Sequence, residues 1–165
     1  MSRSTPKPAT PTGWLLAIDT SSDRAGLALF DGEAPHECTW PAERKQTTQV
    51  PPRIAELLER EGLAVSDLAG IAVAIGPGTF TGLRVGLSLA KGLAMAEGLP
   101  IVGVPMLEAT ALPWTRAGRP IIAVLPAGRG RIVWQKFGRD PDGAAPVNGT
   151  PAELIEAVAN LEVDA

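Results

Sequence analysis

The segment that decides the fold of this chain is Ile71-Ala72-Val73-Ala74-Ile75-Gly76-Pro77-Gly78-Thr79-Phe80-Thr81-Gly82-Leu83-Arg84. A short apolar run that passes through closely spaced glycines is typical of a buried strand joined by a tight loop to a helix. The loop lacks the Gly-Lys-Ser/Thr ending of a P-loop and the glycine spacing of a dinucleotide-binding turn. Two interpretations therefore stay open: a tight connection, or a ligand site. A ligand would meet the glycine-rich loop residues Gly76, Gly78, Thr79 and Gly82.

The residues before this segment predict three strands and a helix. Strands at 14–18 and 26–30, the turn pair Asp31-Gly32, and a third strand near 36–40 after that turn indicate an antiparallel meander. Val50, Ile54, Leu57 and Leu58 then share one helical face. We expect Thr47 or Thr48 to cap this helix, Pro51-Pro52 to lie in its first turn, and Gly62 to end it.

The residues after it predict a helix to about Glu97, a strand at 100–104 and a short helix at 106–112. Strands at 121–125 and 132–137 should form a hairpin that turns around Gly128-Arg129-Gly130. We expect a loop at 139–150 and a last helix that starts at Pro151 with Thr150 as its cap. This order predicts an α/β fold with a mixed sheet. We expect a disordered tail at 1–13, a first lobe at 14–118 and the start of a second lobe at 119–165. One strand pair and one helix cannot cover a sheet, so the second lobe should be truncated.

The helix after the glycine loop is apolar almost all round. Leu83, Leu87, Ala90 and Ala94 form one stripe, and a second stripe lies nearly opposite. An apolar surface on two sides predicts cover on two sides, and a protein partner is the favoured cover in so short a chain. The second stripe is the predicted partner surface and comprises Gly82, Val85, Gly86, Leu89, Gly92, Leu93 and Ala96.

A second polar site is predicted where the first strand ends, at Asp19, Thr20 and Ser21. A carboxylate and hydroxyls after a buried strand suit a loop that holds a phosphate or a metal-bound water. The same residues also form ordinary turns, in which Asp and Ser side chains bond their own backbone.

Composition excludes several functional classes. The chain has 165 residues, a formal net charge of -3, one Cys and one His. This charge argues against a broad basic surface for nucleic acid, and one Cys with one His excludes disulfide frameworks and multi-histidine metal sites. No segment predicts a membrane helix or a secretory signal, so we expect a cytoplasmic protein with no membrane contact. No complete catalytic constellation is present in the sequence.

Three motifs resemble the bacterial TsaB (YeaZ) family: Leu-Ala-Ile-Asp-Thr-Ser at 16–21, the glycine segment at 76–86, and Lys-Gly-Leu-Ala at 91–94. The resemblance covers roughly residues 14–137. It implies a two-lobed fold of the actin, sugar-kinase and heat-shock ATPase type, related to ribonuclease H.

The resemblance also implies a function in making threonylcarbamoyladenosine in tRNA. Family members are non-catalytic partners of a TsaD-type transferase, work with a TsaE-type ATPase, contact tRNA indirectly, and form homodimers when alone. The resemblance implies that partners meet through both helices of the first lobe, which adds Val50 and Ile54 to the predicted interface. No catalytic residue, metal or cofactor of its own is then expected, although ATP could enter with TsaD. Asp19, Thr20 and Ser21 would be a vestigial phosphate loop.

This chain departs from the family pattern at three places. Gln46-Thr47 replaces His-Ser, the strand ending Asp-Ala-Arg becomes Leu125-Pro126-Ala127-Gly128-Arg129, and Pro51 precedes Pro52, which should delay the regular helix. The alternative function is an independent ATP-dependent kinase or hydrolase of the same fold. A peptidase is disfavoured because the sequence lacks a metal-ligand set.

Overall fold

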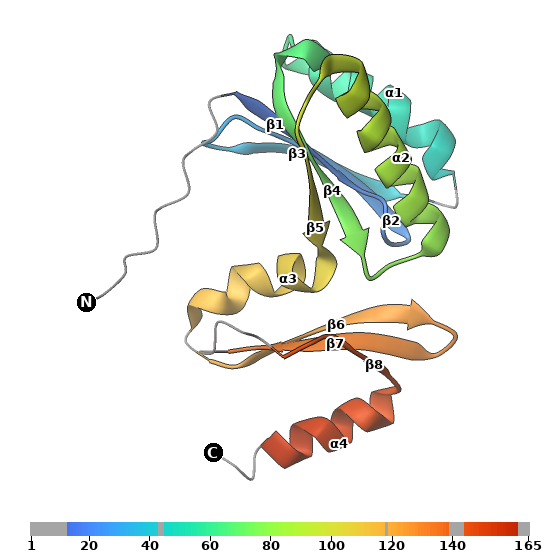
Figure 1. The fold of residues 1–165 in the computed structure, drawn as a ribbon, viewed down its shortest axis with the longest axis vertical. Coiled ribbons are helices and arrows are strands. Elements are labelled where there is room, and N and C mark those ends of the chain that lie inside the picture. Colours follow the sequence, from blue (N-terminus) through green and yellow to red (C-terminus); the bar gives the residue numbers. More distant parts are fainter. Residues whose placement is uncertain (1–12, 43–44, 118, 139–143, 162–165) are drawn as a thin grey trace, which may run out of the picture.

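The computed structural model describes residues 13–42, 45–117, 119–138 and 144–161, in two sheets with their helices (Figure 1). The tail predicted at 1–13 lies outside these residues, except for Gly13. The larger sheet contains β1 (Trp14–Asp19), β2 (Arg24–Phe30), β3 (Pro35–Pro41), β4 (Leu68–Gly76) and β5 (Ile101–Pro105) in the order β3-β2-β1-β4-β5. β1, β2 and β3 pair antiparallel, whereas β4 and β5 continue parallel to β1. The predicted mixed sheet is confirmed.

The core lies on one face of this sheet. Pairing sets Leu16 beside Ile71 and Ile18 beside Val73, so the large apolar side chains of neighbouring strands share that face. Helices α1 (Gln46–Arg60) and α2 (Phe80–Glu97) cover it together (Figure 1). Each fully buried Leu, Ile or Val contributes about 1.5–3 kcal/mol to stability.

Helix α1 begins earlier than the sequence predicts. Its first residue is Gln46 and Lys45 is the N-cap, so Pro51 and Pro52 lie beyond the first turn and neither Thr47 nor Thr48 caps the helix. Burial of Gln46 and Val50 against the sheet holds this extra turn in place. The prolines lack N–H groups, so the carbonyls of Thr47 and Thr48 lose their usual helical donors. Gly62, at φ 67°, ends the helix as predicted.

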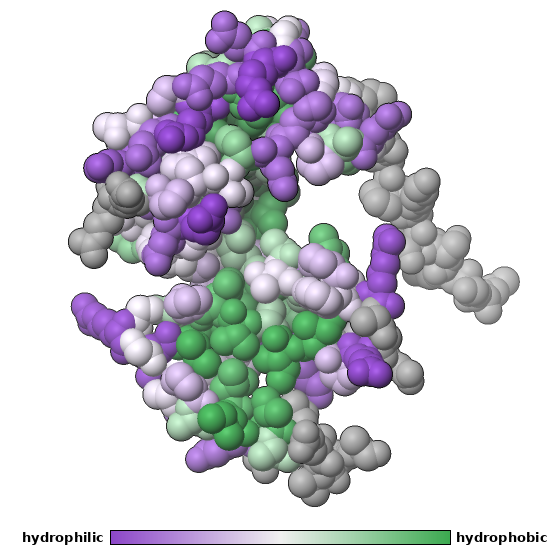
Figure 2. Space-filling view, turned by 180° about the vertical axis from the view of Figure 1, so that it is seen from behind, coloured by the Kyte–Doolittle hydropathy of each residue, from purple (hydrophilic) through white to green (hydrophobic). Residues whose placement is uncertain are grey.

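The smaller sheet follows a helical connection. The short helix η1 (Val65–Asp67) precedes β4 in the first half of the chain. After β5, the helices α3 (Met106–Ala111) and η2 (Leu112–Ala117) lead to the second sheet. This part contains β6 (Ile121–Gly128), β7 (Arg131–Phe137), β8 (Val147–Gly149) and α4 (Pro151–Leu161). The strands pair antiparallel in the order β6-β7-β8. β8 was not predicted: it lies in the expected loop, and only three residues pair with β7, too few for a periodic signal. Viewed from behind, hydrophobic residues gather over this half of the molecule (Figure 2).

Thr150 caps α4, as predicted. Its Oγ1 accepts a hydrogen bond from the Glu153 N–H at 3.3 Å, while Glu153 Oε2 accepts from the Thr150 N–H at 2.6 Å. This reciprocal pair is a capping box. The hydrogen bonds from the Thr150 N–H and hydroxyl hold the pKa of Glu153 below its ordinary value.

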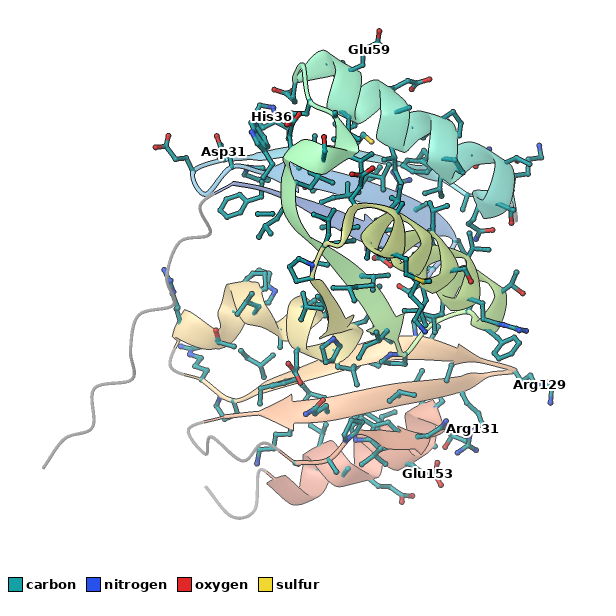
Figure 3. The ribbon with its side chains drawn as sticks, turned by 45° about the horizontal axis from the view of Figure 1, so that its top comes forward. Asp31, His36, Glu59, Arg129, Arg131 and Glu153 are labelled. Carbon is teal, nitrogen blue, oxygen red and sulfur yellow. The ribbon has the colours of Figure 1, made fainter. Side chains whose placement is uncertain are left out.

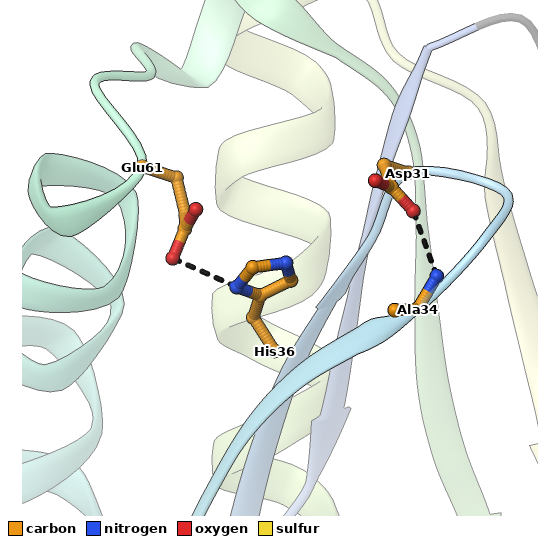
Figure 4. A network of polar contacts seen from close by, with 4 residues as sticks. All are labelled: Asp31, Ala34, His36 and Glu61. Carbon is orange, nitrogen blue, oxygen red and sulfur yellow. Dashed lines mark hydrogen bonds and ion pairs between the residues drawn. The ribbon is translucent and has the colours of Figure 1, made fainter.

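The β2–β3 turn contains a carboxylate whose charge matters for stability. Asp31 Oδ1 accepts from the N–H groups of Glu33 and Ala34 at 2.8 and 3.0 Å, which lowers the pKa of Asp31 below its ordinary 3.8, with Ala34 the larger cause (Figure 4). The folded state therefore favours the ionised carboxylate, so its contribution is present above pH 3.8 and is lost as pH falls through the lowered value.

We expect urea denaturation curves to show this pH dependence. From about pH 4 downward, the wild-type chain should lose stability relative to Asp31→Asn, which keeps an acceptor oxygen but does not titrate. Above pH 5 the difference between the two proteins should be constant. A constant difference down to pH 2 would contradict the assignment.

Candidate functional site

The predicted phosphate loop is folded into the core rather than exposed. Thr20 is 1% exposed, and its Oγ1 donates a hydrogen bond to the carbonyl of Gly82 at 2.7 Å. Ser21 is also buried; its N–H donates to Asp19 Oδ1 at 2.8 Å, and its carbonyl accepts from the Thr79 N–H at 2.6 Å. The turn after β1 is therefore bonded directly to the loop that opens α2.

The glycines of that loop make this approach possible. A Cβ added at Gly78 would overlap Ser21, at Gly82 it would overlap the Thr20 carbonyl oxygen, and at Gly86 it would overlap Thr20 Oγ1. The segment that comes close to the helix at Gly82 and Gly86 is therefore the chain's own β1–β2 turn. Gly76, at φ 98°, is required for a different reason, because its conformation is left-handed.

These contacts determine whether the turn has hydrogen-bond donors left for a phosphate or a nucleotide. The Ser21 and Thr79 N–H groups and the Thr20 hydroxyl already have partners within the chain. A phosphate at this turn needs such donors, and the Asp19 carboxylate beside them would repel it. The residues present do not fit a bound phosphate, and the vestigial character of Asp19, Thr20 and Ser21 stays a prediction.

The Thr20 hydrogen bond should be important for stability. We expect Thr20→Val, which keeps the shape but not the hydroxyl, to lower the free energy of unfolding by about 1–3 kcal/mol, because the buried Gly82 carbonyl loses its side-chain donor. Thr20→Ser keeps the donor and should retain more stability than Thr20→Val. Urea denaturation compares the three proteins, and equal stabilities would show that this bond contributes nothing.

A cleft lies between the turn and the second sheet. It has a volume of about 330 Å³, and its walls are Ser21, Ser22, Asp23, Arg24, Pro77, Gly78, Thr79, Leu125 and Pro126. Pro126, where the family pattern has an aspartate, thus lies on the cleft wall and offers no carboxylate. Gln46, the other departure, is buried in the first turn of α1.

The outward face of α2 carries a larger, mostly apolar groove of about 630 Å³. Its lining residues are Thr47, Phe80, Thr81, Arg84, Val85, Ser88, Leu89, Gly92 and Leu93. Val85, Leu89, Gly92 and Leu93 belong to the predicted interface, and Ala96 is exposed on the same helix. The structure thus brings these five to one accessible helix.

Four other residues of the predicted interface are buried inside the chain: Val50, Ile54, Gly82 and Gly86. Val50 and Ile54 pack in the core beneath α1, and the two glycines face the β1–β2 turn. The interface prediction is corrected for these four, because residues buried inside the folded chain offer almost no surface to a partner.

Phe80 is a groove residue that the sequence analysis missed. Its side chain is 74% exposed, and the Arg84 guanidinium carbon lies 5.0 Å from its ring centroid. The sequence did contain a signal for this pair, because an aromatic residue four positions before an arginine on a helix can stack against its guanidinium.

The described residues hold no group of three or more His, Cys, Asp or Glu side chains that could bind a metal. His36 Nδ1 instead lies 2.9 Å from Glu61 Oε1, which links β3 to the end of α1 (Figure 4). Burial raises the pKa of the Cys38 thiol, which disfavours the reactive thiolate. None of the described helices is long and apolar enough to span a membrane.

Most of the chain matches the model of a known protein family. Residues 18–155 match the model described as TsaD, tRNA N6-adenosine threonylcarbamoyltransferase. The tRNA threonylcarbamoyladenosine biosynthesis protein TsaB of Escherichia coli is 31% identical over 131 residues, which cover 78% of this chain and 57% of that protein. The structure of YeaZ from Pseudomonas aeruginosa superposes with a TM-score of 0.73 at 25% identity, covering 84% of this chain and 68% of that one. The chain belongs to the TsaB/YeaZ family.

Other TsaB proteins agree in sequence. The Haemophilus influenzae protein is 40% identical over 98 residues, which cover 59% of this chain and 41% of that protein. The chain thus spans about half the length of these curated TsaB proteins. The superposition on YeaZ confirms the actin-like, ribonuclease H-like fold class.

Proposed function

We propose that this TsaB/YeaZ chain is a non-catalytic partner subunit in tRNA threonylcarbamoyladenosine modification. In this proposal it docks on a TsaD-type transferase through the outward face of α2 and supports its active conformation. A TsaE-type ATPase completes the assembly, the chain needs no cofactor of its own, and any ATP enters with the enzymes. The complex acts in the cytoplasm. The observation that carries the proposal is the apolar groove on α2, because a helix already packed against its own sheet still presents a second apolar face.

The groove has the composition of a protein interface. Val85, Leu89 and Leu93 supply a half-buried aliphatic centre, and Gly92 lets a partner helix approach closely. Phe80 and Arg84 at one end are residue types that are enriched in protein interfaces. Apolar centres with polar or aromatic margins are typical of docking sites for helices. The same face would support a homodimer when the transferase is absent.

The decisive experiment combines capture with activity. The purified chain should retain a TsaD-type transferase of its own organism in a pulldown, and threonylcarbamoylation of tRNA should rise when the chain is added to transferase and ATPase. ATP turnover by the chain alone would instead favour an independent kinase or hydrolase. Absence of both capture and stimulation would overturn the proposal.

A further inference from the structure

The β6–β7 turn presents an arginine in an unusual conformation. Gly128, Arg129 and Gly130 have φ values of 76°, 53° and 73°, and Arg129 is the sole non-glycine residue with positive φ in the described part of the chain. Such backbone is unfavourable for a side-chain-bearing residue. Figure 3 shows Arg129 at the tip of the hairpin, directed away from the body of the protein.

A second arginine of the same turn is held in a fixed orientation. Arg131 Nε donates to Asn148 Oδ1 at 2.8 Å, and its NH2 group donates to the Asn148 carbonyl at 2.8 Å. A guanidinium has five N–H donors, so three remain free on this exposed side chain. Because Asn148 already orders the guanidinium, little side-chain entropy would be lost when it binds an anion.

The local charge is positive although the chain as a whole is acidic. Neither Arg129 nor Arg131 forms an ion pair with any residue that the structure describes. Glu153 is the acidic group close enough to sense Arg131, but its carboxylate is bonded to Thr150. The turn therefore has two guanidinium charges against one engaged carboxylate.

The surroundings of the turn favour a phosphate over a protein surface. Residues 127–131 are all exposed and include no large apolar side chain, so a protein would find no hydrophobic centre there. Contacts with phosphate need only guanidinium or ammonium groups and N–H donors.

We propose that the basic turn, Gly128–Arg131, binds the phosphate backbone of RNA. This inference rests on the proposed function, in which the RNA is tRNA. Arg129 reaches out to one phosphate, and the free edge of the Arg131 guanidinium, held by Asn148, contacts another.

The test is fluorescence anisotropy of a labelled tRNA transcript across a salt series, for the full chain alone and with the captured transferase. The double variant Arg129→Gln/Arg131→Gln should bind at least about tenfold more weakly near 100 mM salt. Its slope of log affinity against log salt should fall by about 1.4–1.8, because two phosphate contacts are lost. Asn148→Ala should show a smaller loss. Arg60→Gln, at the exposed end of α1, is the matched control and should bind like wild type.

Three results would overturn the inference. The first is a double variant that binds tRNA within twofold of wild type and with an unchanged salt slope. The second is the absence of tRNA binding by the wild-type chain, both alone and in the complex. The third is loss of transferase capture by the double variant with unchanged tRNA binding, which would assign the turn to an acidic protein. The two proposals can fail separately, since capture through α2 does not use these arginines, and tRNA binding by the chain alone does not need the transferase.

Discussion

Leu89→Glu is expected to abolish capture of the transferase and formation of homodimers while the monomer stays folded. Leu89 lies half-buried at the centre of the groove on α2, so a carboxylate there would lose its water on binding without gaining a partner charge. Central interface positions of this kind contribute about 2 kcal/mol or more, which corresponds to at least about 30-fold in affinity. Light scattering after size exclusion measures the dimer, and a pulldown measures the heterocomplex.

Met95→Glu is the matched control for this experiment. Met95 is on the same helix, 84% exposed, and roughly 120° around the axis from Leu89 at 100° per residue. Met95→Glu adds the same negative charge as Leu89→Glu, but it should leave the homodimer and the heterocomplex intact. An undiminished heterocomplex with Leu89→Glu would place the interface elsewhere. Gly86→Leu is unsuitable for this purpose, because its side chain would collide with Thr20 and disturb the fold itself.

Gly82→Ala is expected to destabilise the chain severely. Its methyl group would occupy the space of the Thr20 carbonyl oxygen, and both segments are anchored, Thr20 directly after β1 and Gly82 in α2. Relief requires α2 to shift from β1 and β4, so we expect a loss of at least about 4 kcal/mol, against a typical domain stability of about 5–15 kcal/mol. The melting temperature should fall by about 8–16 °C for a chain of this length.

Gly92→Ala tests the same substitution where the helix has room. No atom lies within 4 Å of a Cβ at Gly92, so alanine there should stabilise the chain by about 0.5–1 kcal/mol through its better helix propensity. Circular dichroism melts of the two variants should therefore move in opposite directions. A melting temperature of Gly82→Ala within 2 °C of wild type would mean that the turn can move away at little cost.

Most of the fold could be predicted from the sequence, because apolar periodicity and turn residues coincide along the chain. The apolar run at 71–75, the glycine loop and the long helix after it appear in β4, the loop and α2 as expected. Helix α1 could not be predicted at its start, since prolines normally mark a first turn and tertiary burial of Gln46 and Val50 overrode that preference. β8 was missed because a three-residue strand depends on its partner for detection.

The candidate site was predictable only in part. The sequence indicated that α2 is apolar on two sides, but it could not assign each stripe to the core or to the surface. Gly82 and Gly86 were grouped with Leu89, although the glycines face Thr20 and Leu89 faces the groove. The deciding contact joins residues 62 positions apart, and such a distance is invisible to helical periodicity.

The burial of Thr20 and Ser21 in the β1–β2 turn has a consequence for hydrogen exchange. Surface turns usually open in small local fluctuations, so their amides exchange quickly with solvent. Here the Thr79 N–H is bonded to the Ser21 carbonyl, and Gly78 and Gly82 lie directly against Ser21 and Thr20. Opening it would require α2 to leave the sheet, so the amide proton of Thr79 should exchange as slowly as those of the central strands. We therefore expect these two connecting segments, the β1–β2 turn and the glycine loop, to unfold together with the central strands as one cooperative unit.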